Sequence, residues 1–163
     1  RMFDGMDCRP YDYVMSGEYR NENASLHRTI KWSEFAAICE RLRNLYTEYG
    51  SLEGLGDAQI RVQVFGQKED RKAPNKKISM MRRWMVRDDG KVALGVWKNS
   101  DKRQLILLLD VHVYGKAVEL GLTSRRQKDI VTAKEITDAF REIFPDDPCL
   151  GDFALFGYGV NNK

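Results

Sequence analysis

The chain has 163 residues and a formal net charge of +3, with 42% hydrophobic and 31% charged residues. These values are typical of one folded domain with a single core and argue against a disordered chain. No apolar run approaches the roughly 20 residues that a membrane-spanning helix needs, and the first ten residues show no secretion-signal pattern.

The N-terminal residues show no clear helical period. Alternating side chains at residues 11–20 predict one strand within an extended arm. Tyrosine is favoured at protein interfaces, and this arm carries Tyr11, Tyr13 and Tyr19. We expect these tyrosines to dock on a neighbouring copy, with ordinary strand positions as the alternative. The sequence thus divides into an arm with the first strand (1–25) and a globular part (26–163), one domain overall.

Two segments have the period of amphipathic helices. In Ser33–Tyr49, apolar residues recur at spacings of three and four and form one stripe. Ser33 suits the first position as an N-cap, and Gly50 suits a left-handed stop. The second helix is expected to open at a capping box, Thr132–Glu135, and to end before Pro145.

Five further segments are expected to be β-strands, and apolar and polar residues alternate clearly in the first and fourth of them. They are Ala58–Phe65, Ser79–Arg87, Lys91–Trp97, Gln104–Tyr114 and a closing strand near Phe153–Phe156. The turn Asp88-Asp89-Gly90 favours a hairpin between the second and third of these. We therefore expect an α+β fold, a single domain in which an antiparallel β-sheet of about five strands packs with two amphipathic helices.

Positive charge is concentrated in Gly66–Arg87, which has a net charge of +6 and leaves −3 for the rest of the chain. Its cations are Lys68, Arg71, Lys72, Lys76, Lys77, Arg82, Arg83 and Arg87. We expect these eight side chains to bind a polyanion such as RNA, DNA or anionic lipid. A solvated loop that only adds solubility is the alternative. Trp84 and Trp97 would supply stacking rings for unpaired bases, or would lie in the core.

The sequence contains no recognisable catalytic or metal-binding motif. The three cysteines are widely spaced, which favours reduced thiols over a disulfide framework or a zinc site. Cys39 and His112 can be paired as a dyad, but no family signature supports that pairing. Asp110 and His112 share a strand face without an identifiable third metal ligand. We therefore expect no enzyme activity, no metal and no cofactor.

The order of the expected elements resembles the globular domain of rhabdovirus matrix proteins, plant-infecting members in particular. That order is strand, helix, strand, exposed loop, antiparallel strands, helix and closing strand. Two local patterns add to the resemblance, Met81-Arg82-Arg83-Trp84 and the run Asp152–Gly157 after the second helix. The segment Gly66–Lys77 departs from the family, because it is polar and basic, whereas the corresponding loop of the family is partly apolar.

The resemblance implies a structural protein that self-associates, condenses the nucleocapsid and bridges it to the membrane during budding. Its implied partners are further copies of itself, the viral nucleocapsid or RNA, and an anionic membrane surface. Its implied location is the virion, with the host cytoplasm or nucleus during infection.

The basic segment alone supports a second hypothesis, a single-stranded nucleic-acid-binding module that does not polymerise. Its affinity would fall steeply with salt, because bound phosphates release counterions. A hydrolase built on Cys39 or His112 is a more distant third hypothesis.

Overall fold

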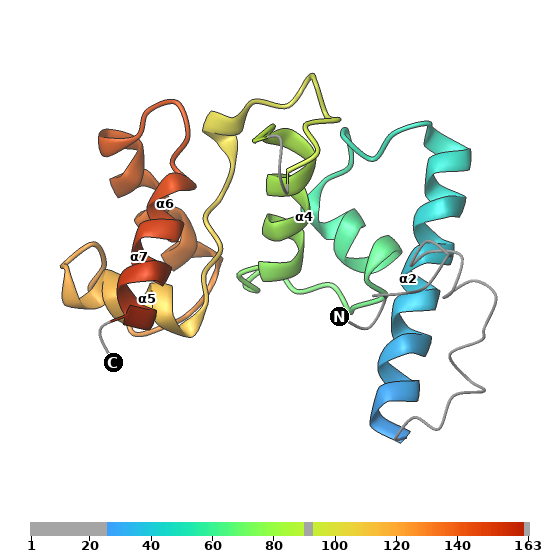
Figure 1. Ribbon diagram of the computed structural model, residues 1–163, viewed down its shortest axis with the longest axis horizontal. Helices are drawn as coiled ribbons and strands as arrows, with labels where there is room; N and C mark the ends of the chain where they lie inside the picture. Colours follow the sequence, from blue (N-terminus) through green and yellow to red (C-terminus); the bar gives the residue numbers. More distant parts are fainter. Residues whose placement is uncertain (1–25, 90–92, 162–163) are drawn as a thin grey trace.

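The computed structural model describes residues 26–89 and 93–161, and these residues form helices joined by loops (Figure 1). In chain order they are α2 (Leu26–Tyr49), α3 (Asp57–Gln59), a π-helical turn η2 (Ile60–Val64), α4 (Lys76–Val86), a 3-10 turn η3 (Lys102–Gln104), α5 (Val111–Glu119), α6 (Ile130–Ile143) and α7 (Leu150–Asn161). Within the described residues the only strand-like pairing is an isolated antiparallel bridge between Asp88 and Leu94. The expected α+β fold with a five-stranded sheet is therefore wrong.

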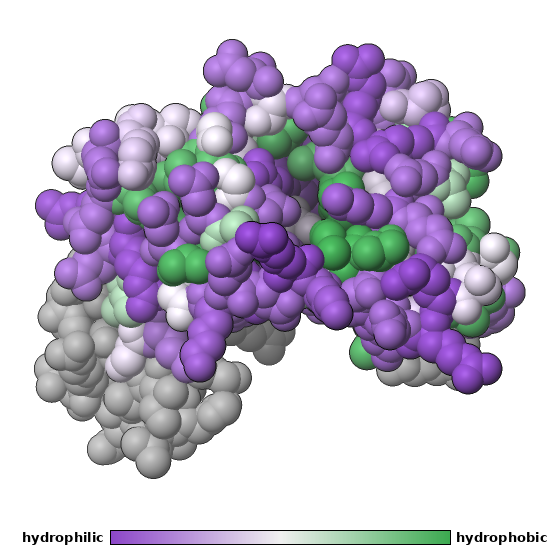
Figure 2. All heavy atoms as spheres, turned by 180° about the vertical axis from the view of Figure 1, so that it is seen from behind, coloured by the Kyte–Doolittle hydropathy of each residue, from purple (hydrophilic) through white to green (hydrophobic). Residues whose placement is uncertain are grey.

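Buried apolar side chains form two clusters. The N-terminal cluster consists of Leu45, Leu52, Ile60, Val64, Ile78 and Trp97. The C-terminal cluster consists of Leu107, Leu109, Val113, Ala117, Ala133, Ile136, Phe140 and Leu155. Figure 1 shows α5, α6 and α7 on one side, α2 on the other, and α4 between them. On the face opposite to that of Figure 1, exposed hydrophobic residues form separate patches among hydrophilic ones (Figure 2).

The first expected helix is confirmed as part of α2, which starts earlier than Ser33. Gly50 ends it in the left-handed region, with φ of +70°, and its N–H donates to the carbonyl of Tyr46 at 2.9 Å. Glycine suits this position because it adopts positive φ without a steric penalty. No helix in the described part of the chain, α2 included, combines the length and the apolar character needed to cross a membrane.

The second expected helix is confirmed as α6, but its cap is not the one predicted. The N-cap is Asp129, whose Oδ1 accepts from the N–H of Thr132 at 2.9 Å. Thr132 lies inside the helix and is completely buried. The predicted capping box at Thr132–Glu135 is therefore wrong, because an aspartate three residues earlier already satisfies the same backbone group.

Two predicted strands are helical because their buried residues are spaced by four or five rather than by two. Ile60 and Val64 are fully buried in η2, while Val62 between them is exposed. In α4 the buried side chains are Ile78, Ser79 and Arg83. Positions four apart share one face of a helix. The apolar residues of Ala58–Phe65 alternate by chance, and that alternation does not reflect which side chains are buried.

The predicted hairpin at Asp88–Gly90 is wrong as a strand pair, although the chain does return along α4. The N–H of Leu94 donates to the carbonyl of Trp84 at 2.6 Å, and the N–H of Trp97 donates to that of Met85 at 2.9 Å. These donors satisfy carbonyls that the end of a helix leaves without partners. The returning segment therefore closes the C-terminal end of α4.

The predicted long strand Gln104–Tyr114 is an unpaired extended connection followed by α5. Leu105, Leu107 and Leu109 are all buried, as the alternation predicted. Side chains take the place of a neighbouring strand, since the N–H of Leu107 donates to Thr137 Oγ1 at 3.1 Å. At Asp110 the carboxylate accepts from two following amides and starts α5.

The predicted closing strand near Phe153–Phe156 lies within α7. The start of α7 packs closely on α6, where a Cβ at Gly151 would lie 2.3 Å from the ring of Phe140. Only glycine fits so near an aromatic ring.

Leu107→Ala is expected to lower the free energy of unfolding by about 2–5 kcal/mol, because it empties space in the C-terminal cluster. Val111→Ala is the matched control, since Val111 is exposed at the start of α5. Urea unfolding followed by circular dichroism measures both. Equal effects of the two substitutions would contradict this description of the core.

Candidate functional site

A pocket of about 410 Å³ lies between α4, α5 and α7, where the two clusters meet. Its apolar wall is formed by Met80, Trp84, Ala93, Leu108, Val113, Phe153 and Phe156. Its charged lining consists of Lys76, Arg83, Arg87, Asp89, Asp110 and Asp152. A concave, mostly apolar site with a few convergent polar groups is the usual form of a ligand pocket.

The floor of the pocket is a buried ion pair between α4 and α7. Arg83 Nη1 lies 2.9 Å from Asp152 Oδ2, and the two side chains are only 7% and 4% exposed. The same carboxylate oxygen accepts from the N–H of Leu108 at 3.0 Å. The guanidinium of Arg83 also stacks 3.6 Å above the ring centroid of Phe153. Burial raises the pKa of Asp152, and the nearby Arg83 charge opposes that rise.

A second ion pair lies at the edge of the pocket. Lys76 Nζ is 3.7 Å from Asp110 Oδ2, and the Asp110 side chain is 11% exposed. Asp110 Oδ1 accepts from the amides of His112 and Val113 at 2.9 and 2.8 Å. One oxygen of this carboxylate therefore holds α5, while the other faces an amine that lines the pocket. Such a pair can bind polar groups of a ligand or exchange a proton with it.

Three aromatic rings on the apolar wall remain accessible. Trp84, Phe153 and Phe156 are 44%, 53% and 47% exposed. Phe156 meets the ring of His112 edge-on, with 6.1 Å between centroids. Accessible rings that project from helices fixed by ion pairs provide stacking surfaces for another flat ring. Trp97, in contrast, is buried in the N-terminal cluster.

The eight cations predicted to bind a polyanion do not form one surface. Arg82, Arg83 and Arg87 pair with Asp57, Asp152 and Asp147 at 2.7, 2.9 and 2.7 Å. Arg71 pairs with Glu69, and Lys76 pairs with Asp110 at the pocket. Lys68, Lys72 and Lys77 are exposed, and Lys77 lies 6.0 Å from the ring centroid of Phe65. Arg82, Arg83 and Arg87 thus hold the fold, and the exposed lysines remain as candidate contacts.

The other predicted sites are also placed. The tyrosines Tyr11, Tyr13 and Tyr19 and the N-terminal strand lie outside the described residues. The Cys39–His112 dyad is not formed, because Cys39 lies in α2 and His112 in α5, on opposite sides of the molecule (Figure 1). In the described ranges, no three His, Cys, Asp or Glu residues are grouped so that they could hold a metal ion.

Sequence reasoning missed Asp110, Phe153 and Phe156 as pocket residues. Asp110 was noted only beside His112, although Asp before a helix is a common N-cap signal. The two phenylalanines are three residues apart, a spacing that places them on one helical face. That signal was present, but the segment was interpreted as a strand.

Arg83→Met is expected to cost about 3–5 kcal/mol of unfolding free energy, because it leaves the Asp152 charge buried without its partner. Adding Asp152→Asn should recover part of that loss, since the amide oxygen can still accept from Leu108.

Arg71→Met serves as the control, because its pair with Glu69 is exposed and worth no more than about 1 kcal/mol. Denaturant titration compares the three proteins. An Arg83→Met variant as stable as the Arg71→Met variant would contradict the importance given to the buried pair.

Comparison with known proteins gives one finding. Neither a curated protein nor a solved structure matches the chain. A family model described as "Protein of unknown function (DUF2400)" matches residues 56–161. The match covers more than half of the sequence and includes α4, α5 and α7 with all the residues that line the pocket. The chain therefore belongs to the DUF2400 family.

Proposed function

We propose that this protein binds unpaired nucleic acid and holds one base in the pocket between α4, α5 and α7. The observation that carries the proposal is the combination of three accessible aromatic rings with a lysine at the edge of the same pocket. Proteins that bind single strands stack bases on aromatic rings and hold phosphates with lysine and arginine.

The size and lining of the pocket fit a flat heteroaromatic ring. A volume of about 410 Å³ lies within the range of about 300–1,000 Å³ that is usual for small-ligand sites. Trp84 and Phe156 are accessible for stacking, as is the part of the Phe153 ring that the Arg83 guanidinium does not cover. The amine of Lys76 and the outer oxygen of Asp110 offer a donor and an acceptor to the polar edge of a base.

The exposed lysines around the start of α4, of which Lys76 lines the pocket, favour a ligand that also carries phosphate. Lys76 and Lys77 open α4, and Lys72 precedes them in the basic loop (residues 66–75). Lys72 and Lys77 are exposed, so phosphates can reach them without breaking an ion pair within the described residues. A purely apolar ligand would make no use of this charge.

The matrix-like function implied by the resemblance stays a prediction. The strand order on which the resemblance depended is not formed by residues 26–89 and 93–161. The pocket therefore does not support the matrix-like functions, which are self-association through the N-terminal tyrosines, nucleocapsid condensation and membrane bridging. The pocket and the exposed lysines around the start of α4 support nucleic-acid binding independently of the resemblance.

Trp84→Ala is expected to weaken binding of a fluorescent single-stranded oligonucleotide by about 5- to 150-fold, because stacking on one ring is worth about 1–3 kcal/mol per base. Trp84 is half-exposed, so the fold should survive its removal. Fluorescence anisotropy gives the dissociation constants.

Tyr49→Ala is the matched control, because Tyr49 is equally exposed at the far end of α2. Its loss should leave affinity unchanged. Equal affinities of the Trp84→Ala, Tyr49→Ala and unsubstituted proteins would refute a base in this pocket.

A second candidate function is an enzyme that acts on the bound nucleotide. The observation that favours it is the Lys76–Asp110 pair at the pocket edge, 3.7 Å apart. An amine and a carboxylate in contact at an apolar pocket can serve as a general acid and a general base. Asp110 is held in place by its bonds to two amides of α5.

Asp110→Asn tests this candidate with little harm to the fold, because asparagine is as good an N-cap as aspartate. If the pair is catalytic, the unsubstituted protein should alter an oligonucleotide in a way that mass spectrometry detects, and the variant should lose that activity while still binding. Equal turnover by both proteins would exclude Asp110 from the chemistry.

A further inference from the structure

One backbone hydrogen bond joins a second basic segment to the loop that precedes α4. The N–H of Ile130, at the start of α6, donates to the carbonyl of Lys72 at 3.0 Å. Figure 1 shows the loop before α4 reaching the segment that leads into α6. The α5–α6 loop (residues 120–129) therefore lies against the basic loop, although more than 50 residues separate Lys72 from Ile130 along the chain.

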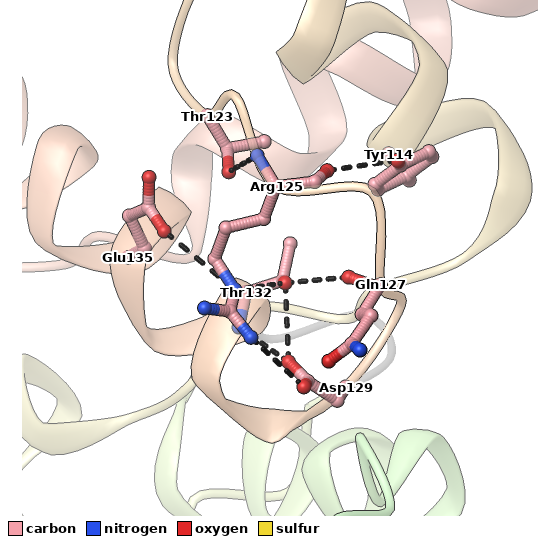
Figure 3. Close-up of polar contacts among 7 residues, drawn as sticks. All are labelled: Tyr114, Thr123, Arg125, Gln127, Asp129, Thr132 and Glu135. Carbon is pink, nitrogen blue, oxygen red and sulfur yellow. Dashed lines mark hydrogen bonds and ion pairs between the residues drawn. The ribbon is translucent and has the colours of Figure 1, made fainter.

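A network around Arg125 fixes the shape of the α5–α6 loop (Figure 3). Arg125 Nε donates to Thr132 Oγ1 at 2.9 Å, and its Nη2 lies 3.0 Å from Asp129 Oδ2. The hydroxyl of Tyr114 donates to the carbonyl of Arg125 at 2.9 Å. Hydrogen bonds to the Asp129 carboxylate, chiefly from Thr132, lower its pKa. These contacts thus fix the loop at its middle, Arg125, and at its C-terminal end, Asp129.

The network uses Arg125 and leaves its basic neighbours on the surface. Arg126 and Lys128 are exposed, and Lys128 Nζ lies 4.9 Å from the ring centroid of Tyr114. Asp129, the nearest carboxylate in sequence, is already paired with Arg125. In the parts of the chain that the structure describes, neither Arg126 nor Lys128 has an ion pair.

Helix α5 connects the edge of the pocket to the residue that supports this loop. Asp110 lines the pocket, and the N–H of Tyr114 donates to the Asp110 carbonyl at 2.9 Å. Tyr114 in turn carries the contacts to Arg125 and Lys128. One helical turn, about 5.4 Å, therefore separates the pocket edge from the residue that supports the α5–α6 loop.

We propose that the exposed side chains of Lys72, Arg126 and Lys128 form a second phosphate-binding site, so that the ligand is a polynucleotide rather than a mononucleotide. This inference rests on the proposed function, because the base bound in the pocket determines where the rest of the nucleic acid lies on the protein. Phosphates of the nucleotides next to that base contact the three cations. Their affinity comes from counterion release and depends on salt.

The test compares ligands of increasing length, a thymidine mononucleotide and oligothymidylates of four and twelve nucleotides. Arg126→Gln/Lys128→Gln is the test variant. Lys98→Gln/Lys102→Gln is the matched control, because it also removes two exposed cations, near the other end of α4. Anisotropy or competition titrations over a range of salt concentrations give affinities and salt slopes.

We expect the test variant to bind the mononucleotide as the unsubstituted protein does and to bind the twelve-nucleotide strand at least tenfold more weakly at low salt. Its salt slope should fall by about 1 to 1.5, since each phosphate contact on a single strand contributes about 0.7. The control variant should show neither change.

An unchanged affinity and slope for the long strand would overturn this inference while leaving the pocket proposal intact, provided that Trp84→Ala still weakens binding. An equal loss for the mononucleotide would also overturn it, because the cations would then act on the pocket itself. Absence of binding at every length would overturn both proposals.

Discussion

The buried contact between Arg83 and Asp152 joins the two halves of this protein. Arg83 comes from the helix that packs on the N-terminal cluster, and Asp152 comes from the helix that packs on the C-terminal cluster. The same aspartate oxygen holds the extended connection at Leu108. An ion pair removed from water is stable only when its geometry is good and its remaining hydrogen bonds are made. These contacts therefore fix the floor of a pocket whose aromatic wall stays accessible.

The two longest helices could be predicted from the sequence, whereas the sheet could not. In α2 and α6 the apolar residues keep a helical spacing over several turns, so a chance alternation of a few residues does not change the prediction. Short segments such as Ala58–Phe65 carry too few residues to separate a period of two from one of four. In Gln104–Tyr114 only the residues between η3 and α5 are extended, and the alternation could not show that side chains of Thr137 and Asp152 would replace the neighbouring strands.

The candidate site could be predicted only in part, because charge in a sequence does not show whether a cation is already paired. Arg82, Arg83 and Arg87 looked like ligand contacts, yet their partners lie 25 or more residues away in the chain. The sequence left open whether Trp84 and Trp97 are stacking rings or core residues; Trp84 lies at the pocket, whereas Trp97 is buried. The contribution of Arg126 and Lys128 depends on the hydrogen bond between Ile130 and Lys72, a tertiary contact that no local pattern indicates.

The most direct measurement of the central claim is photocrosslinking with an oligonucleotide that carries one photoreactive base, followed by mass spectrometry of the attached peptides. The proposed pocket predicts crosslinks to the peptides that contain Trp84, Phe153 or Phe156, and their loss when unlabelled oligonucleotide competes. Crosslinks confined to the exposed basic loop around Lys68, with none in α4 or α7, would show that the strand binds by charge alone and would contradict a base held between the two clusters.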